Sequence, residues 1–154
     1  MKNNIKQLTI DEKKVKINIY SANQIYREEY KMDDLFAALS EKKRLRIINL
    51  LRDNDLCVCE IKTLLQIHQS TASRHLNRLK KIGILESNKK AQWVHYELSS
   101  DFINKNRLLY NYLIKKMDTI DIYIKDTTIL NKYLKSDLSC ENIEKVDDSF
   151  FNIF

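Results

Sequence analysis

The chain has almost no residues of the kind that turn a polypeptide sharply. Its 154 residues include no proline and a single glycine, Gly83. A sheet-rich fold needs many tight turns, and glycine and proline are the usual residues in them. Helices joined by short polar loops need far fewer, so the sequence predicts a mainly helical protein. The length suits one domain with its own hydrophobic core.

Hydropathy and motif content exclude several classes of protein. No apolar run approaches the length that crosses a bilayer, and the first residues lack the apolar core of a signal peptide. We therefore expect a cytoplasmic protein with no membrane contact. The sequence shows no glycine-rich phosphate loop, no nucleophile with a plausible base and no marked carboxylate pair, so we do not expect an enzyme.

Apolar spacing predicts four helices in the first part of the chain. The pattern becomes helical at about Asn23, and a second helix starts at Ser40. Asp55 is placed to cap a third helix, and Ser70 is the natural N-cap of a fourth. Gly83 supplies the stop signal of the fourth helix.

The residue pattern changes from helical to strand-like after the fourth predicted helix. Residues 84–86 and 93–98 are rich in branched and aromatic side chains, and the polar, basic residues 87–91 between them suit a hairpin tip. Residues from about 101 to 134 are again helical, and the tail beyond residue 136 is acidic with an aromatic end. This order predicts a winged helix-turn-helix: mainly α with a small β-hairpin.

Positive charge is concentrated in one third of the chain. The net charge is +6, but residues 40–90 hold 12 Lys/Arg and 5 Asp/Glu, which makes +7 there and −1 elsewhere. Such a focus is the electrostatic footprint expected for a polyanion such as DNA. A solvated basic face on an ordinary helical protein is the alternative that charge alone leaves open.

The fourth predicted helix has the composition of a DNA-reading helix. Its apolar residues share one face, so hydroxyl, amide and guanidinium groups that reach base edges or phosphates point outward. The DNA backbone is within reach of four basic residues before this helix, Lys42, Lys43, Arg44 and Arg46. The lysines at the tip of the hairpin are placed to reach an adjacent groove. His75 has two possible roles: it donates to a phosphate, or it is a structural histidine that lies along the helix. The predicted DNA-binding residues are Gln69, Ser70, Thr71, Ser73, Arg74, His75, Asn77, Arg78, Lys89 and Lys90.

Two of the three cysteines, Cys57 and Cys59, stand one residue apart where the third helix is expected to begin. In a helix interior, side chains at i and i+2 point about 200° apart and could not share a small ion. At the first turn this objection weakens, and the helix N-terminus lowers the thiol pKa and favours the thiolate. The alternative is a small buried hydrophobe, which suits Cys140 better than the spaced pair.

The cysteine pair predicts a site for a soft ion. An ion bridging Cys57 and Cys59 would distort the helix against which the DNA-reading helix packs, and so couple ion binding to DNA binding. Zinc favours four N/S ligands, which this chain supplies poorly. Trivalent arsenic or antimony, with three thiolates, suits the site better. The third thiolate would come from Cys140, from a second subunit or from solution, and no further cofactor is required.

The chain resembles the ArsR–SmtB family of metalloregulatory winged-helix repressors, in its arsenic-responsive branch, over about residues 32–99. The segments that carry the resemblance are Leu35–Ser40 and Arg44–Ile47 for the opening helices, Leu56–Ile61 for the thiolate motif, Gln69–Leu76 for the recognition helix, and Gly83–Leu85 with Gln92–Leu98 for the wing.

The resemblance implies a homodimer that represses a resistance operon and leaves double-stranded DNA when the ion binds. By symmetry its operator is then an inverted repeat with half-sites about one helical turn apart. The chain also departs from the family. Many arsenic-type members carry a third cysteine where this chain has Lys62, residues 1–56 lack the cysteines of the cadmium/lead type, and residues 99–154 lack the histidines of the zinc type.

These expectations divide the chain into three segments: an N-terminal tail or short strand at 1–22, a winged-helix DNA-binding and dimerisation domain at 23–120, and a C-terminal helical extension with an acidic, aromatic tail at 121–154. The expected function is that of a repressor released by arsenite or antimonite at Cys57 and Cys59. The alternatives are a thiol redox-responsive winged-helix regulator and a ligand-independent winged-helix module for protein interaction.

Overall fold

The structure is a computed structural model that describes residues 32–152. The chain divides into two compact units, Met1–Phe36 and Ala37–Phe154. Residues 32–39 are helical. The tail or strand expected at 1–22 and the helix start expected near Asn23 lie outside the described residues.

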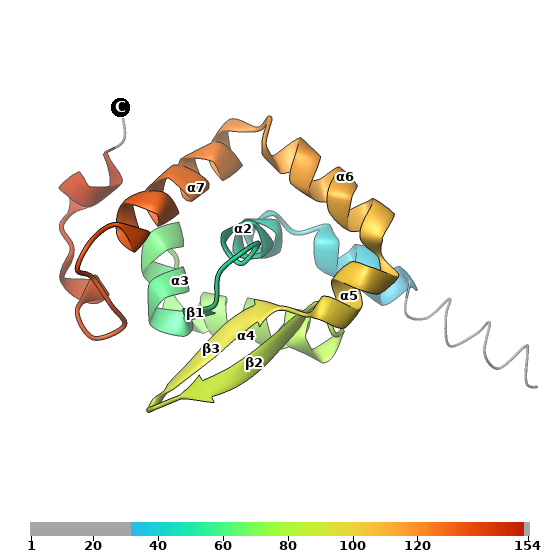
Figure 1. The fold of residues 1–154 in the computed structure, drawn as a ribbon, viewed down its shortest axis with the longest axis horizontal. Coiled ribbons are helices and arrows are strands. Elements are labelled where there is room, and N and C mark those ends of the chain that lie inside the picture. Colours follow the sequence, from blue (N-terminus) through green and yellow to red (C-terminus); the bar gives the residue numbers. More distant parts are fainter. Residues whose placement is uncertain (1–31, 153–154) are drawn as a thin grey trace, which may run out of the picture. The chain divides into compact units, whose positions relative to one another are not determined.

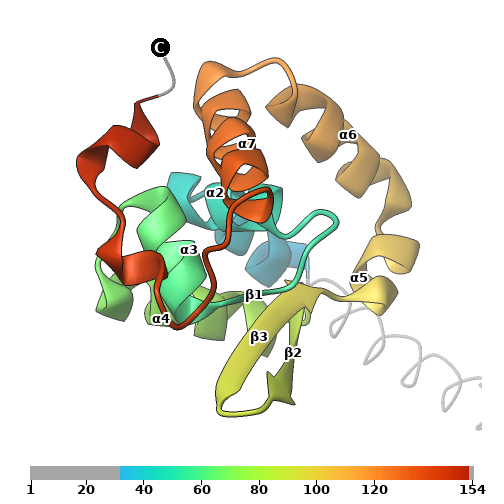
Figure 2. The same ribbon diagram turned by 60° about the vertical axis from the view of Figure 1, so that its left-hand side comes forward.

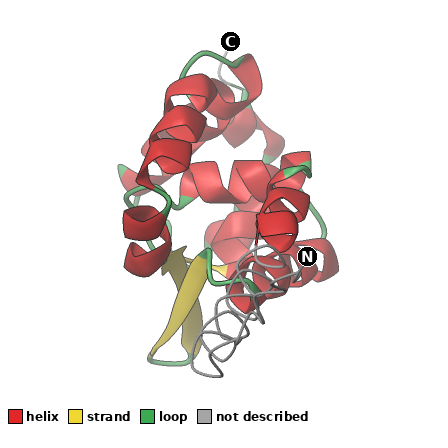
Figure 3. Ribbon diagram, turned by 90° about the vertical axis from the view of Figure 1, so that its right-hand side faces the viewer, coloured by secondary structure: helices red, strands yellow, loops and turns green. Residues whose placement is uncertain are grey.

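The second unit combines helices with a small antiparallel sheet (Figure 1, Figure 3). The three strands are ordered β1-β3-β2. Its elements are α2 (Lys42–Leu50), β1 (Leu56–Cys57), α3 (Val58–Leu65), α4 (Gln69–Lys81), β2 (Leu85–Lys90), β3 (Trp93–Leu98), α5 (Ser100–Lys105), α6 (Arg107–Met117), α7 (Asp121–Leu134) and two short 3₁₀ helices, η1 (Ile143–Lys145) and η2 (Asp148–Phe151).

The hairpin of β2 and β3 confirms the predicted wing, and β1 adds a strand to its other edge. Leu56 pairs with Tyr96 and Cys57 with His95. The strands run closer to the tip than expected, because β2 continues to Lys90 and the turn falls at Ala91, whose φ is 54°. Residues 87–90 are therefore strand residues, and the expected tip at 87–91 was too wide.

Two of the expected helix caps are wrong. The N-cap of α3 is Cys57, because the Glu60 side chain accepts a hydrogen bond from the Cys57 N–H at 2.6 Å, the carboxylate half of a capping box. Asp55 instead faces Lys90 of the hairpin, with 2.5 Å between Nζ and Oδ2. Helix α4 starts one residue before Ser70, with His68 as its N-cap.

The stop expected at Gly83 is confirmed. Helix α4 ends at Lys81, and Gly83 follows with a φ of 79°. Only glycine adopts this left-handed conformation without steric cost, and it turns the chain from α4 into the first strand of the hairpin.

Helix α7 packs against α2 through buried polar contacts. The Arg46 guanidinium donates two hydrogen bonds of 2.7 Å to the carboxylate of Asp126, whose side chain is 1% exposed. Asn49 donates to the backbone oxygen of Tyr123 at 3.0 Å. Arg46 was expected to contact the DNA backbone, but its guanidinium neutralises a carboxylate inside the protein, and the DNA contact stays a prediction.

Arg44 is also engaged within the protein. Its guanidinium donates to the carbonyl oxygens of Ala37 and Ala38, at the end of the preceding helix. Helix ends leave such carbonyls without an intrahelical partner, and a cation close to them is favourable. The DNA contact expected for Arg44 stays a prediction.

Residues 136–152, called here the C-terminal segment, fold back beside α3 (Figure 2). Its Ile143 is fully buried and its Phe151 is 9% exposed. The Lys132 ammonium of α7 lies 4.6 Å from the ring centre of Phe150 and donates to its backbone oxygen. Phe150 therefore docks on α7, and Phe151 is buried. No helix in the described part of the chain is long and apolar enough to span a membrane.

Candidate thiolate site and nucleic-acid interface

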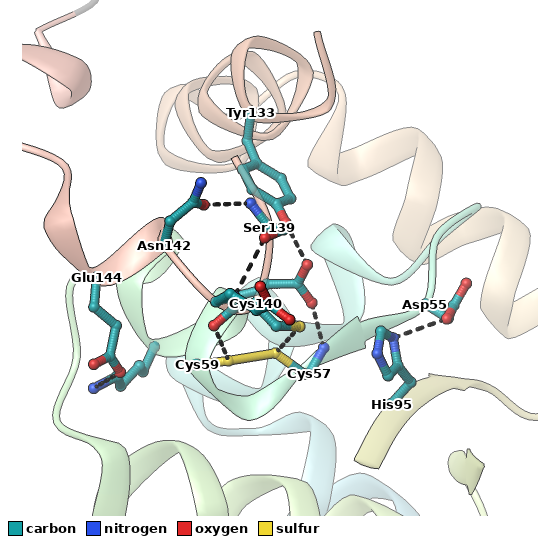
Figure 4. The surroundings of a disulfide bond; sticks show 12 residues. Asp55, Cys57, Cys59, His95, Tyr133, Ser139, Cys140, Asn142 and Glu144 are labelled. Atoms are coloured by element: carbon teal, nitrogen blue, oxygen red, sulfur yellow. Dashed lines mark hydrogen bonds and ion pairs between the residues drawn. A yellow bond between two sulfur atoms is a disulfide. The ribbon is translucent and has the colours of Figure 1, made fainter. Parts of the chain in front are cut away.

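The sulfur atoms of all three cysteines lie together at the start of α3, within 4.8 Å of one another (Figure 4). Cys57 and Cys59 are joined by a disulfide bond. The Cys140 Sγ lies 2.6 Å from the Cys57 Sγ across a sequence separation of 83 residues. The C-terminal segment brings this third sulfur to the pair.

The backbone at the beginning of α3 explains why Cys57 and Cys59 can face the same point. Cys57 ends β1 and has extended dihedral angles, φ −81° and ψ 168°. Cys59 is the second residue of the helix. Because one residue of the pair lies outside the helix, the divergence of i and i+2 side chains does not apply to it.

Glu60 and Tyr133 tie the end of α7 to this helix start. One Glu60 oxygen accepts from the Cys57 N–H at 2.6 Å, and the other accepts from the Tyr133 hydroxyl. Burial, and then the hydrogen bond to Glu60, raise the pKa of Tyr133 above its ordinary value. Sequence reasoning missed Glu60, although its position three residues after Cys57 has the spacing of a capping box.

The three cysteines are largely shielded from solvent. Cys57 is 1% exposed and Cys59 8% exposed, while Cys140 is partly exposed. Burial, followed by the nearby Glu60 carboxylate, raises the pKa of Cys140 to about 12. Cys140 is therefore a neutral thiol near pH 7, and a thiophilic ion must displace its proton to bind.

A hollow of about 500 Å³ extends from the cysteines towards the recognition helix and the wing. It joins the thiolate site to the elements that would touch DNA. Its lining residues are Cys57, Val58, Cys59, Gln69, Trp93, Val94, Cys140, Glu141 and Glu144.

Most of the predicted DNA-binding residues lie on the outer surface of α4 and the hairpin. Gln69, Ser70, Arg74, Asn77, Lys89 and Lys90 are exposed, and Thr71, Ser73 and Arg78 are partly exposed. The apolar face of the same helix is buried, with Ala72, Leu76 and Leu79 all 0% exposed. This is the division between an outward polar face and a packed face that a groove-reading helix requires.

His75 is buried, and the exposed Lys90 is paired with a carboxylate of the protein. His75 is 5% exposed, its Nε2 lies 3.7 Å from a Glu41 oxygen, and burial lowers its pKa. Lys90 pairs with Asp55, and this hydrogen bond is the main reason why the pKa of Asp55 is lowered. His75 thus occupies the place of a structural histidine, and Lys90 has a carboxylate partner.

The family model for the arsR family of bacterial regulatory proteins matches residues 41–87. An uncharacterized HTH-type transcriptional regulator of Methanocaldococcus jannaschii is 39% identical over 80 residues, which cover 51% of this chain and 90% of that protein. The chain belongs to the arsR family. The family is one of regulatory proteins, in agreement with the expectation that the chain is not an enzyme.

Other relatives of this arsR-family protein include regulators named for metal resistance. The cadmium resistance transcriptional regulatory protein CadC of Listeria innocua is 40% identical over 62 residues, 40% of this chain and 52% of that protein. The arsenical resistance operon repressor of Escherichia coli is 44% identical over 66 residues, 42% of this chain and 56% of that protein. The match spans only about half the length of these relatives.

A solved structure supports the fold. The homodimeric winged helix-turn-helix DNA-binding domain Mb0332 of Mycobacterium bovis has a TM-score of 0.52 and 22% sequence identity, and the match covers 59% of this chain and 84% of that domain. At this identity the likeness concerns the fold alone. The predicted winged helix-turn-helix is confirmed, with β1 as an addition to it.

Proposed function

We propose that the protein is a DNA-binding transcriptional repressor that leaves its operator when trivalent arsenic or antimony binds Cys57, Cys59 and Cys140. The observation that carries this proposal is the meeting of three sulfur atoms at the start of α3. Helix α3 packs against α4, the proposed recognition helix. A ligand at these sulfurs therefore acts on the support of the DNA-reading face.

The donor set fits a trivalent metalloid. The three clustered ligand atoms are all cysteine sulfurs. Soft thiolate ligands select thiophilic ions, and trivalent arsenic and antimony take three of them. A structural zinc site would need a fourth nitrogen or sulfur ligand. In many arsenic-type members of the family the third ligand is a nearby cysteine, where this chain has Lys62. In this protein Cys140 takes the role of that third ligand.

Ion binding reaches the DNA-reading elements by two routes. Cys57 is a residue of β1, which pairs with β3 of the wing. Cys59 lies in α3, which packs on α4. A change in the backbone at either cysteine is therefore passed to one of the two elements that contact DNA, which is the differential effect that allosteric coupling requires.

The proposed DNA-binding form is a homodimer on an inverted repeat. Helix α6 carries exposed apolar side chains, with Leu108 89% and Tyr112 60% exposed. Such a face is a candidate for burial against a second copy, and the related domain from M. bovis is homodimeric. Two recognition helices related by a twofold axis would read two half-sites about one helical turn apart.

The proposal is tested by arsenite-induced release from DNA. Selection from a random duplex library with reduced protein yields the operator, and fluorescence anisotropy then measures affinity with and without arsenite. We expect release of the wild type, and retained DNA binding without release for Cys57→Ser and Cys59→Ser. Zinc at equal concentration serves as the control ion. If the Cys57→Ser/Cys59→Ser double variant is still released by arsenite, the site assignment fails.

The disulfide between Cys57 and Cys59 favours a second candidate, a thiol redox-responsive regulator. In that case two thiols and one peroxide molecule give the disulfide and two molecules of water. Hydrogen peroxide, rather than arsenite, would then release the operator. A chain that selects no DNA sequence at all would instead favour the ligand-independent interaction module.

A further inference from the structure

We propose that the C-terminal segment is an acidic gate over the start of the recognition helix, closed by the ion that the three cysteines bind. The inference rests on the proposed function and adds the means by which ion binding weakens DNA binding. It assigns a role to residues 136–152.

The C-terminal segment is attached to α3 through η1. Ile143 is 0% exposed, and Glu144 forms an ion pair of 2.5 Å with Lys62. Its regular structure is limited to 3₁₀ helices of three and four residues. Because Cys140 lies in the same segment, a bond from an ion to the Cys140 sulfur adds a further attachment of this segment to the start of α3.

The docked segment places acidic side chains beside the start of α4. Glu141 and Glu144 line the same hollow as Gln69, the first residue of α4, and Trp93 of the wing. The first turn of a helix presents unpaired N–H groups and a positive dipole end, which attract phosphate. Carboxylates at this place oppose the approach of the DNA backbone through like-charge repulsion.

The charge of the segment is suited to this role. Positions 136–152 hold five acidic residues and one lysine. The recognition helix and wing, by contrast, lie in the strongly basic part of the chain. A docked segment therefore reduces the positive potential at the DNA-reading face, and an undocked one restores it.

The two ligands prefer opposite positions of the segment. The ion gains three cysteine sulfurs when the segment is docked and only two when it is not, so ion binding increases the docked population. DNA prefers the undocked position because phosphates avoid the carboxylates. Coupling between binding sites is reciprocal, so operator DNA also weakens ion binding by the same factor.

Charge-neutral variants of the full-length chain test the gate. Glu141→Gln leaves the pair of Lys62 and Glu144 intact, and Glu141→Gln/Glu144→Gln removes both acids of the hollow. The matched control is Asp137→Asn/Asp148→Asn, which changes the charge of the segment equally but at exposed positions outside the hollow. For each variant, anisotropy gives the ratio of DNA dissociation constants with and without arsenite. Sulfur–arsenic absorbance gives the arsenite affinity.

We expect the arsenite affinity of Glu141→Gln to equal that of the wild type. Its ratio of DNA dissociation constants with and without arsenite should fall about two- to fivefold, which is the effect of one exposed charge interaction. The ratio of the double variant should fall further. The control pair should keep the wild-type ratio. The losses should shrink in high salt, because screening removes interactions between exposed charges.

A Cys140→Ser variant tests the attachment itself. We expect it to bind arsenite more weakly through two cysteines and to be released from DNA far less at saturating arsenite. The gate is disproved if the wild type is released by arsenite but the Glu141/Glu144 double variant, or arsenite-saturated Cys140→Ser, shows the same ratio. Absence of any arsenite response in the wild type contradicts the proposed function instead.

Discussion

At the scale of single residues, the candidate site depends on Cys57 having three roles. It ends β1, it is the N-cap of α3, and its sulfur lies in the cluster. The spaced cysteines and the helix start were readable from the sequence, since both follow from local pattern. The Glu60 contact was not predicted, because a cysteine is an unusual N-cap and the cap was expected at Asp55.

The hydrogen bond from Tyr133 to the buried Glu60 carboxylate predicts a loss of stability in Tyr133→Phe. Leaving a buried acceptor without its donor costs about 1–3 kcal/mol. We therefore expect the free energy of unfolding in urea to fall by that amount, and arsenite binding to weaken because α7 leads directly into the C-terminal segment. Tyr112→Phe, at a tyrosine that is 60% exposed, is the control. Equal stability of the two variants would contradict the role of Tyr133.

His75 predicts a loss of stability in mild acid. Burial lowers its pKa below the ordinary 6.5 in the folded protein, with Arg44, Arg74 and Lys43 acting in the same direction and Glu41 against it. Below pH of about 6.5 the unfolded chain therefore binds a proton that the folded chain does not, and stability falls as the pH falls through this window.

The prediction is tested by urea unfolding of wild type and His75→Gln between pH 7.5 and 5.5. Because the variant has no imidazole, its stability should fall less over this range. A histidine whose charged form is stabilised in the folded protein would give the opposite order, with the wild type gaining stability on acidification.

At the scale of elements, the ion pair between the partly exposed Arg46 and the buried Asp126 links α7 to α2. Removing one member of a buried ion pair leaves an uncompensated charge and costs about 3–5 kcal/mol. We expect Arg46→Ala to lower the unfolding free energy by this amount. Lys43→Ala, at an exposed position of the same helix, should change stability by no more than about 0.5 kcal/mol.

For DNA binding we expect the opposite order, with an effect of Lys43→Ala and none of Arg46→Ala. Under conditions where both variants are folded, Lys43→Ala should reduce the salt dependence of DNA affinity by about 0.9 in log–log slope if Lys43 contacts a phosphate. Arg46→Ala should leave this slope unchanged. A reduced slope for Arg46→Ala would instead support the expectation that Arg46 contacts DNA.

Element types were easier to predict than element boundaries. The helices and the hairpin have apolar periods long enough to show in the sequence. Strand β1 has only two residues and is defined by its pairing with β3, a contact that no local pattern contains. Residues 101–134 kept a helical spacing of apolar residues, yet they form three helices interrupted near Asn106 and Thr119.

At the scale of the whole molecule, the third sulfur was the least predictable part of the site. Cys140 is 81 residues from Cys59 and belongs to a segment with little regular structure. The sequence alone favours a packing or surface role for this cysteine over that of a ligand. Its position depends on how α7 packs on α2, on the buried Ile143 and on the contact of Tyr133 with Glu60. These contacts join residues far apart in the sequence, so a local sequence pattern does not predict the position of Cys140.

The central claim is that one chain supplies three sulfur ligands to one metalloid ion. Arsenic-edge X-ray absorption of the reduced, anaerobic protein with one equivalent of arsenite measures the sulfur coordination number directly. We predict three sulfur neighbours for the wild type and two for Cys140→Ser. Two sulfur neighbours in both proteins would remove Cys140 from the site and contradict the account.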